Sequence, residues 1–385
     1  MTTVQSCFIN LVRNVVVGKK LPNDFEICDL VELYKFSKKQ DMAHIVAYGL
    51  KKNNLIDLNS DLWKRYYNKQ YSLAQFRVMN LENECKKVCY VFETAGVDYV
   101  PLKGAVIRSL YPESWMRVSC DIDILVRKEQ LLSAENVLTE KLGYRKTRDG
   151  VILEHHHDNF TSPNGFTLEL HLSLSEKETL AKDYLDEVWN NVTLVANYRH
   201  QFVMNDEMLY FYHIYHAAHH FKTGGCGVKA VLDTWLILNG IKEVNPVCLE
   251  MLKKSQLLEF SNAIETVAKK WFSGVPSDKY IYMEEYILNG GMQGGGNFVA
   301  AYQTTTNGNR VKYYIRRAFP SYDLMHKIYP QLKDKKYLLP YYWIKRLCMA
   351  FSSSKSKRTK AEIKTAWLEK EKSQKIKAMF DELGL

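Results

Sequence analysis

The sequence predicts an α+β protein, with a small α/β core flanked by N-terminal helices and by a helical C-terminal region. Two observations lead to this class. Residues 97–175 contain short runs in which polar and apolar side chains alternate, the pattern of half-buried strands. On either side, apolar residues recur at three- and four-residue spacing, the pattern of helices that bury one face. We expect an N-terminal helical segment (1–96), the core (97–175), a helical C-terminal domain (176–345) and a basic helical tail (346–385).

The N-terminal segment carries three helical patterns. They cover Asp29–Phe36, Met42–Leu50 and Leu62–Ala95, and the last is a long stretch without proline. The character of the chain changes at Gly96, because the residues that follow, Val97–Leu102, form a short apolar run that is typical of a strand.

The core continues with a helix-like stretch, Ala105–Tyr111, that follows Lys103-Gly104. Asp121–Val126 alternates acidic and apolar side chains, which predicts a strand. A helix stopped by Gly143 comes next, and then three strands, the last two joined as a hairpin by a Pro-Asn-Gly turn. In order, these elements are Glu129–Leu142, Tyr144–Arg148, Leu153–Thr161 and Phe166–Leu172.

Helical patterns return after about residue 176. Asp206–Phe221 is one helix, and Val228–Asn239 is another that we expect Gly240 to end. The glycine-rich Asn289–Asn297 predicts a flexible connector. It lacks the preceding strand and the Lys-Ser/Thr of a phosphate-binding P-loop.

The composition excludes several classes of protein. With 46% hydrophobic and 25% charged residues, the chain is neither disordered nor collagen-like. No run approaches the ~18 apolar residues of a membrane span, and polar residues interrupt the apolar stretch Cys7–Val17, which argues against a signal peptide. The eight cysteines form no CxxC pair. We therefore expect a cytoplasmic protein without a membrane span.

The net charge of +10 is concentrated in residues 310–360, where 14 Lys and Arg face two Asp. Tyrosines and Trp343 are interleaved with these cations and could stack on bases, so the region is a candidate surface for an anionic partner. The alternative is a solvated helical face whose aromatic side chains pack inward.

Three carboxylates are the candidate catalytic and metal-binding residues. Asp121 and Asp123 are two apart on a predicted strand, so both side chains point to one face. Burying them together is costly unless a cation neutralises them, and carboxylate oxygens suit Mg²⁺. Glu169, on another predicted strand, would complete a site for two metal ions that serve phosphoryl transfer. The alternative is an exposed strand with an acidic face.

Four residues near these carboxylates are candidates for nucleotide binding. Lys103 and Gly104 stand where a strand turns into a helix, and backbone N–H groups at such a start can hold phosphate. Arg117 offers a planar guanidinium that could clamp a phosphate group. His171 shares the face of Glu169 and could orient a carboxylate or a phosphate, or could be an ordinary strand histidine.

These motifs resemble the uncharacterised nucleotidyltransferase family of the DNA polymerase β-type superfamily. The resemblance rests on strand–Lys-Gly–helix, Tyr111-Pro112, Arg117, Asp121–Val126 and Leu168-Glu169-Leu170-His171. It is specific over about residues 97–175 and extends weakly to about 345. One departure is Lys103-Gly104, where the superfamily usually has Gly-Gly or Gly-Ser.

The resemblance implies a mixed sheet and transfer of a nucleoside monophosphate from an NTP to an acceptor hydroxyl, with release of pyrophosphate. By position, Asp121, Asp123 and Glu169 would hold Mg²⁺ or Mn²⁺. The acceptor would be a small molecule, a protein or RNA. Two alternatives remain on the same fold: a nucleotide- or RNA-binding module without catalysis, and an antitoxin-like protein-interaction module.

Several further polar residues are candidates for lining the cleft. His219 and Asp233 form a helical pair that also resembles the family, and Lys229 borders the glycines between their helices. His157 lies in a predicted strand, where a solvated face is the alternative. The i,i+4 pair His216/His220 would allow a zinc site, although packing and cleft-lining roles fit it better.

Overall fold

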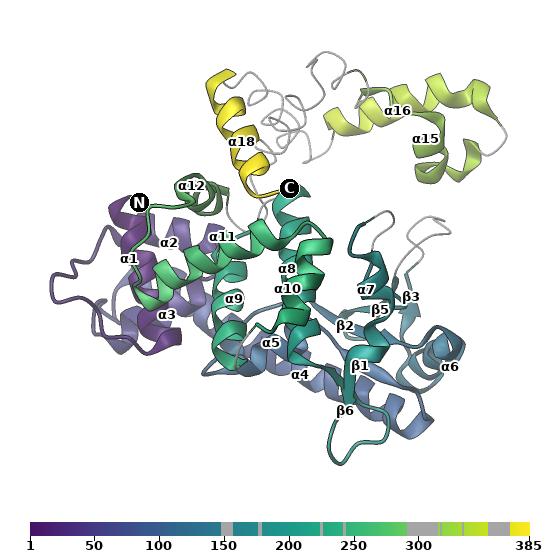
Figure 1. Ribbon diagram of the computed structural model, residues 1–385, viewed down its shortest axis with the longest axis horizontal. Helices are drawn as coiled ribbons and strands as arrows, with labels where there is room; N and C mark the ends of the chain where they lie inside the picture. The colour runs from purple at the N-terminus through teal and green to yellow at the C-terminus, as the bar shows by residue number, and fades with distance from the viewer. Residues whose placement is uncertain are drawn as a thin grey trace.

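The computed structural model describes residues 1–147, 157–175, 179–223, 226–241, 244–290, 315, 318–332, 335–352 and 370–385. It is an α+β structure in which helices surround one five-stranded mixed sheet (Figure 1). The fold class expected from the sequence is confirmed. The elements of the core also appear in the expected order, because the local hydrophobic period specifies each of them.

The sheet has the strand order β1-β2-β5-β4-β3. β2 and β5 run parallel at its centre, and every other neighbouring pair is antiparallel. Ser162, Gly165 and Phe166 close the predicted hairpin between β4 and β5 through backbone hydrogen bonds, with Gly165 at a φ of 83°. The strands are β1 (Tyr99–Pro101), β2 (Asp121–Val126), β3 (Arg145–Lys146), β4 (His157–Thr161) and β5 (Thr167–His171).

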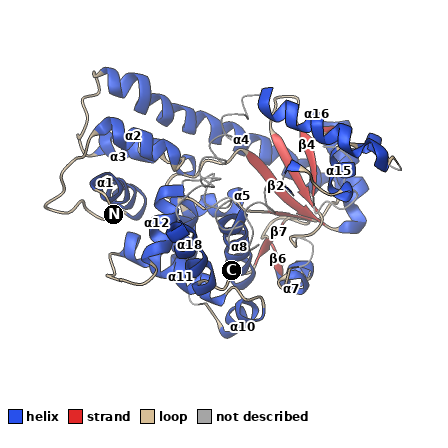
Figure 2. Ribbon diagram, turned by 90° about the horizontal axis from the view of Figure 1, so that it is seen from above, coloured by secondary structure: helices blue, strands red, loops and turns tan. Residues whose placement is uncertain are grey.

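The two faces of the sheet have different chemistry. Ile122 and Ile124 of β2, with Leu168 and Leu170 of β5, pack with helix α4 (Asn68–Ala95) and α6 (Leu131–Asn136) in one buried cluster. Figure 2 shows the strands beside the long α4. Side chains of a strand alternate between faces. The acidic residues of β2 therefore face the other way, toward the helices that follow the sheet in sequence.

The N-terminal helices are α1 (Thr3–Val12), α2 (Leu30–Lys39) and α3 (Ala43–Lys52), followed by the π-helical turn Trp63–Tyr67 and α4. Asp29 caps α2 by accepting hydrogen bonds from the backbone N–H groups of Val31 and Glu32. Gly96 ends α4 at a φ of 74°, the left-handed conformation that glycine adopts without strain.

The C-terminal helices share one large hydrophobic core with the N-terminal helices. Their bounds are α7 (Lys182–Asp186), α8 (Asp206–Thr223), α9 (Val228–Gly240), α10 (Pro246–Lys254), α11 (Leu258–Ala268) and α12 (Ile281–Gly290). The last helix, α18 (Lys370–Glu382), returns to this core through Phe380, whose ring lies 5.5 Å from that of Phe221.

Three details differ from the local sequence patterns. A second sheet, β6 (Val192–Leu194) with β7 (Phe202–Met204), stands where we expected only helix, because three-residue strands are too short to show an alternation. Gly240 is the last residue of α9 and has no positive φ, so it is not a left-handed cap. The helix after Gly104 is one turn long, α5 (Gly104–Ile107), followed by the 3₁₀ turn Arg108–Leu110.

In the basic region, the described residues include α15 (Tyr322–Ile328) and α16 (Leu339–Ser352). Tyr342 is buried with Met325 and Leu332, as inward packing predicts, whereas Tyr337 and Tyr341 are exposed. The connector expected at Asn289–Asn297 lies mostly outside the described residues. No described helix combines the length and hydrophobicity that a bilayer crossing requires.

Candidate active site

A cleft of about 520 Å³ opens between the acidic face of the sheet and helices α8 and α9. Its volume is within the range of ~300–1,000 Å³ that is typical of small-molecule sites. The sheet side contributes the ends of β2 and β5, the Lys103-Gly104 turn and the loop before β2. The residues proposed from the sequence that line this cleft are Lys103, Gly104, Arg117, Asp121, Asp123, Glu169, His171, His219, Lys229 and Asp233.

Strand register brings the three carboxylates together. β2 and β5 are parallel, and Asp123 pairs directly with Glu169, while Asp121 precedes Asp123 by two residues on the same face. Asp123 is 4% exposed, so its charge has little solvent around it. Burial, and then the charges of Asp123 and Glu169, raise the pKa of Asp121 above its ordinary value.

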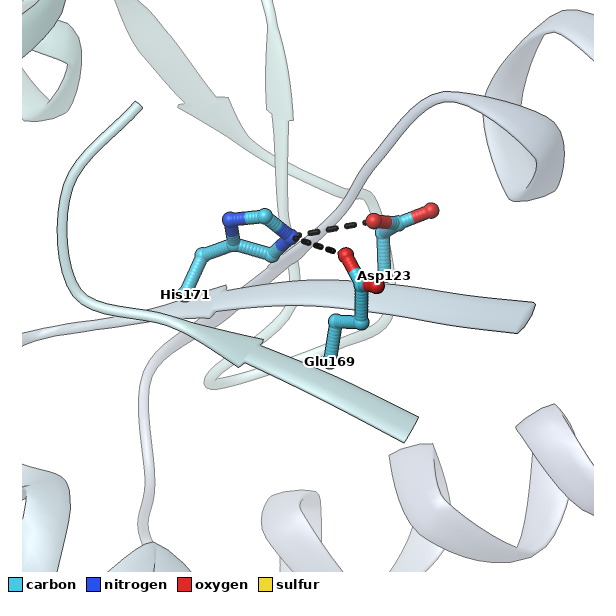
Figure 3. Close-up of side chains that lie close together, drawn as sticks. All are labelled: Asp123, Glu169 and His171. Carbon is cyan, nitrogen blue, oxygen red and sulfur yellow. Dashed lines mark hydrogen bonds and ion pairs between the residues drawn. The ribbon is translucent and has the colours of Figure 1, made fainter. Parts of the chain in front are cut away.

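Two basic side chains contact Asp123. Lys103 Nζ lies 2.7 Å from Asp123 Oδ1 and 3.9 Å from Glu169 Oε2. His171 Nε2 lies 3.0 Å from the same Oδ1 and 3.5 Å from the same Oε2, as Figure 3 shows. Burial alone would raise the pKa of Asp123, but the hydrogen bond from His171 and the charge of Lys103 more than offset it and lower that pKa.

The turn that carries Lys103 has an unusual backbone. Lys103 has a φ of 42° and a ψ of −110°, which costs on the order of 1–3 kcal/mol for a residue with a Cβ. The Leu102 N–H donates to the Asp123 carbonyl, which ties the turn to β2. A Cβ on Gly104 would lie 2.9 Å from Ser119 Oγ and 3.1 Å from Arg117 Nη1, so the loop before β2 can approach only a glycine.

Arg117 makes a buried ion pair with Asp233 of α9. Its Nε lies 3.1 Å from both Asp233 oxygens and its Nη2 lies 2.9 Å from Oδ2, while the Tyr111 hydroxyl donates to Oδ1 at 2.7 Å. Burial would raise the pKa of Asp233, but the Arg117 charge lowers it below its ordinary value. The guanidinium expected to clamp a phosphate thus has two of its three nitrogens on a carboxylate.

Two more cations hold the backbone of the loop before β2. Arg108 Nε donates to the Arg117 carbonyl at 3.2 Å and its Nη2 donates to Ser119 Oγ at 2.8 Å. Lys229 Nζ, from α9, donates to the Val118 carbonyl at 3.2 Å and lies 3.6 Å from Asp41. Burial, together with the charge of Arg117, lowers the pKa of Lys229. These contacts fix the entry to β2.

Helix α8 forms the opposite wall with Tyr212, His216, His219 and His220. His216 Nε2 and His220 Nε2 lie 3.1 Å apart, and burial lowers the pKa of both imidazoles. Within the described residues, this pair is not part of a group of three or more metal-ligating side chains. His157 pairs with His171 in the register of β4 and β5.

The residues that could hold a metal ion are on the sheet. Asp123, Glu169 and His171 offer ligand atoms within 4.8 Å of one another, the one such group of three among the described residues. Asp121 adds a carboxylate on the same strand face. Carboxylate oxygens are the ligands of hard cations, and imidazole nitrogen also suits transition metals. The donor set therefore fits a divalent ion such as Mg²⁺ or Mn²⁺.

Sequence reasoning did not single out Arg108, Asp41 or Tyr212, and gave Tyr111 no role of its own. Arg108 follows Gly104 by four residues and directly follows the apolar residues Ala105–Ile107, which was the available signal; the structure buries it. Asp41 comes from the turn between α2 and α3, far from the core in sequence, so no local pattern indicates it.

Comparison with known proteins adds the family. A family model described as an uncharacterised nucleotidyltransferase matches residues 28–273, well over half of the chain. Neither a search of curated proteins nor one of solved structures returned a match. The matched residues run from α2 through the sheet to the end of α11, and they include every side chain of the cleft. The chain belongs to the uncharacterised nucleotidyltransferase family.

Proposed function

We propose that this protein transfers a nucleoside monophosphate from an NTP to an acceptor hydroxyl and releases pyrophosphate. Family membership indicates nucleotidyl transfer in general. The observation that carries the proposal is the convergence of Asp121, Asp123 and Glu169 from two neighbouring strands onto the wall of one cleft. A cleft of about 520 Å³ has room for a nucleotide.

Asp121, Asp123 and Glu169 would hold Mg²⁺, or Mn²⁺ in its place. A divalent ion there would neutralise charge on the phosphate oxygens and on the leaving pyrophosphate. Lys103 and His171 keep Asp123 ionised and fix its orientation, since both contact Oδ1. An ionised, oriented carboxylate is what a hard cation requires.

The triphosphate would lie beside the Lys103-Gly104 turn. Gly104 lets the Ser119 hydroxyl and Arg117 Nη1 approach closely, so donors gather at the turn. Arg117 would act mainly by fixing this turn, because Asp233 holds its Nε and Nη2. His171 would orient the carboxylates of Asp123 and Glu169, since its Nε2 lies close to an oxygen of each.

In the reaction, the acceptor oxygen would form a bond to the α-phosphorus, and the bond from that phosphorus to the pyrophosphate oxygen would break. The acceptor proton would pass to the Glu169 carboxylate, which is less buried than Asp123. The acceptor would enter between the sheet and α8, where His219 and Lys229 line the cleft. A small molecule, a protein or RNA fits this description, and residues 310–360 are the candidate surface for an anionic one.

The test is incubation with each α-labelled NTP and Mg²⁺, with and without cell extract. We expect label to move to an acceptor, and Asp121→Asn and Asp123→Asn to lower the rate at least about 100-fold. Asp278→Asn, an exposed aspartate outside the cleft, is the matched control.

Three results would refute this proposal. Full activity in either active-site variant would exclude the assigned carboxylates. Salt-dependent binding of NTP or RNA without pyrophosphate release would favour a non-catalytic module, and a stable protein partner that is indifferent to Asp121→Asn would favour an interaction role.

A further inference from the structure

The Lys103 ammonium lies at the same oxygens that a metal ion would bind. Asp123, Glu169 and His171 form the one three-residue ligand group among the described residues. Lys103 Nζ is 2.7 Å from Asp123 Oδ1 and 3.9 Å from Glu169 Oε2, the two oxygens to which His171 also points. An ammonium at these distances balances carboxylate charge as a bound cation does.

The backbone directs this lysine inward. Lys103 has a φ of 42°, a conformation that glycine adopts freely and that strains any residue with a Cβ. Such strain persists only where the surroundings impose it, and here the Leu102 N–H bond to Asp123 and the close approach to Gly104 do so. The side chain is only 21% exposed and ends on Asp123. A residue with a side chain at a position that suits glycine is expected to supply something that glycine lacks, which here is the ammonium.

The carboxylate oxygens of Asp121 and the Oδ2 atom of Asp123 are the remaining candidate ligand atoms. Asp121 makes no ion pair with any residue in the described ranges, and within them Asp123 Oδ2 contacts no cation. Asp121, Asp123 and Glu169 carry three negative charges, of which Lys103 already balances one. A second divalent ion at Asp123 Oδ1 and Glu169 Oε2 would have to displace the ammonium or lie against it, and like charges so close repel strongly.

We propose that Lys103 is a built-in cation that takes the place of one of the two divalent ions predicted from the sequence. The site then binds a single Mg²⁺ or Mn²⁺ ion, through the carboxylate of Asp121 and Oδ2 of Asp123. This inference rests on the proposed function and keeps its transfer reaction, but it removes Glu169 from the ligands of the divalent ion. Lys103 does not leave Asp123 to bind the triphosphate.

The test counts Mn²⁺ ions on the full chain without nucleotide, by equilibrium dialysis and electron paramagnetic resonance. The wild type should bind one ion with the spectrum of an isolated Mn²⁺. Lys103→Met keeps the length of the side chain and removes its charge, so this variant should bind two ions. Two ions about 3.5–4 Å apart would give a spin-coupled spectrum. A misfolded variant would lose the arrangement of the site and would give no spin-coupled pair.

Lys254→Met is the matched control, because Lys254 is an exposed lysine on α10 that pairs only with Glu250 among the carboxylates of the described residues. It should bind one ion, and Asp121→Asn in the wild-type background should weaken Mn²⁺ binding at least about 10-fold. A coupled pair in the wild type, or one uncoupled ion in Lys103→Met, would overturn the inference and leave the proposed function standing. No Mn²⁺ binding by the wild type would overturn both.

Discussion

The buried pair of Arg117 and Asp233 joins the loop before β2 to helix α9. The side chain of Arg117 is 10% exposed and that of Asp233 is 5% exposed, and their three hydrogen bonds are 3.1 Å or shorter. Replacing Asp233 by alanine would leave the Arg117 guanidinium buried without a counter-ion. We expect Asp233→Ala to lower the free energy of unfolding by about 3–5 kcal/mol, the usual result of breaking one side of a buried pair.

A double-mutant cycle separates the pair from its surroundings. Arg117→Met should be destabilised by a similar amount, because Asp233 then keeps only the Tyr111 hydroxyl. The combination of Arg117→Met with Asp233→Ala removes both charges and leaves neither of them buried alone, so it should cost much less than the sum of the two single losses. Tyr111→Phe removes one hydrogen bond to a charged group and should cost about 2 kcal/mol.

The measurement is urea unfolding followed by circular dichroism at pH 7, with Asp278→Ala as the control for an exposed aspartate. We expect an interaction energy of about 3 kcal/mol between the two sites. If the double variant lost as much stability as the two single variants together, the pair would not act as a unit, and its role in holding the loop would be refuted.

Three other predictions concern buried residues in and around the cleft. Gly104→Ala should lose about 1–3 kcal/mol and lower turnover, because its Cβ would lie 2.9 Å from Ser119 Oγ, whereas Gly240→Ala, with its nearest atom at 3.5 Å, should be neutral in thermal melts. Burial lowers the pKa of His44 and of His213 to about 4, so these histidines bind protons in the unfolded chain at a higher pH than in the folded protein. The free energy of unfolding should therefore fall between pH 6.5 and 4, by up to about 3 kcal/mol for each histidine. In urea titrations, His213→Gln should make this fall smaller. Because the pKa of Asp233 is lowered, its ionised form stabilises the fold at a pH above the ordinary value of 3.8. The difference in free energy of unfolding between wild type and Asp233→Asn should therefore become smaller as the pH is taken below 4. A constant difference would contradict the lowered pKa of Asp233.

Local patterns predicted what local physics determines. The alternation in Asp121–Val126 predicted both the strand and the shared face of Asp121 and Asp123, because strand side chains alternate whatever surrounds them. The same reasoning placed Glu169 on a strand. Its position opposite Asp123 depends on the parallel register of β2 and β5, which the residues of neither strand specify alone.

Contacts distant in sequence could not be predicted in this way. Arg117 and Asp233 are 116 positions apart, and an arginine near an acidic strand fits a phosphate clamp as well as a structural ion pair. Lys103 is a similar case, because from the sequence its ammonium is equally suited to binding a phosphate group. The structure shows that Lys103 has a positive φ and that its ammonium contacts Asp123. The short β6 and β7 were missed because three residues carry no detectable period.

The acidic face of the sheet depends on the helices that follow it. On one face of β2, the buried Ile122 and Ile124 pack with α4 and α6, two helices that lie close to β2 along the chain. The entry to the other face is held by Lys229 and Asp233 of α9, which bind the loop at Val118 and Arg117. Removing α9 would leave Arg117 buried without a carboxylate and free the loop that delivers Asp121. Residues of β2 and of α9 therefore line one cleft, although the change in sequence character near residue 176 lies between them.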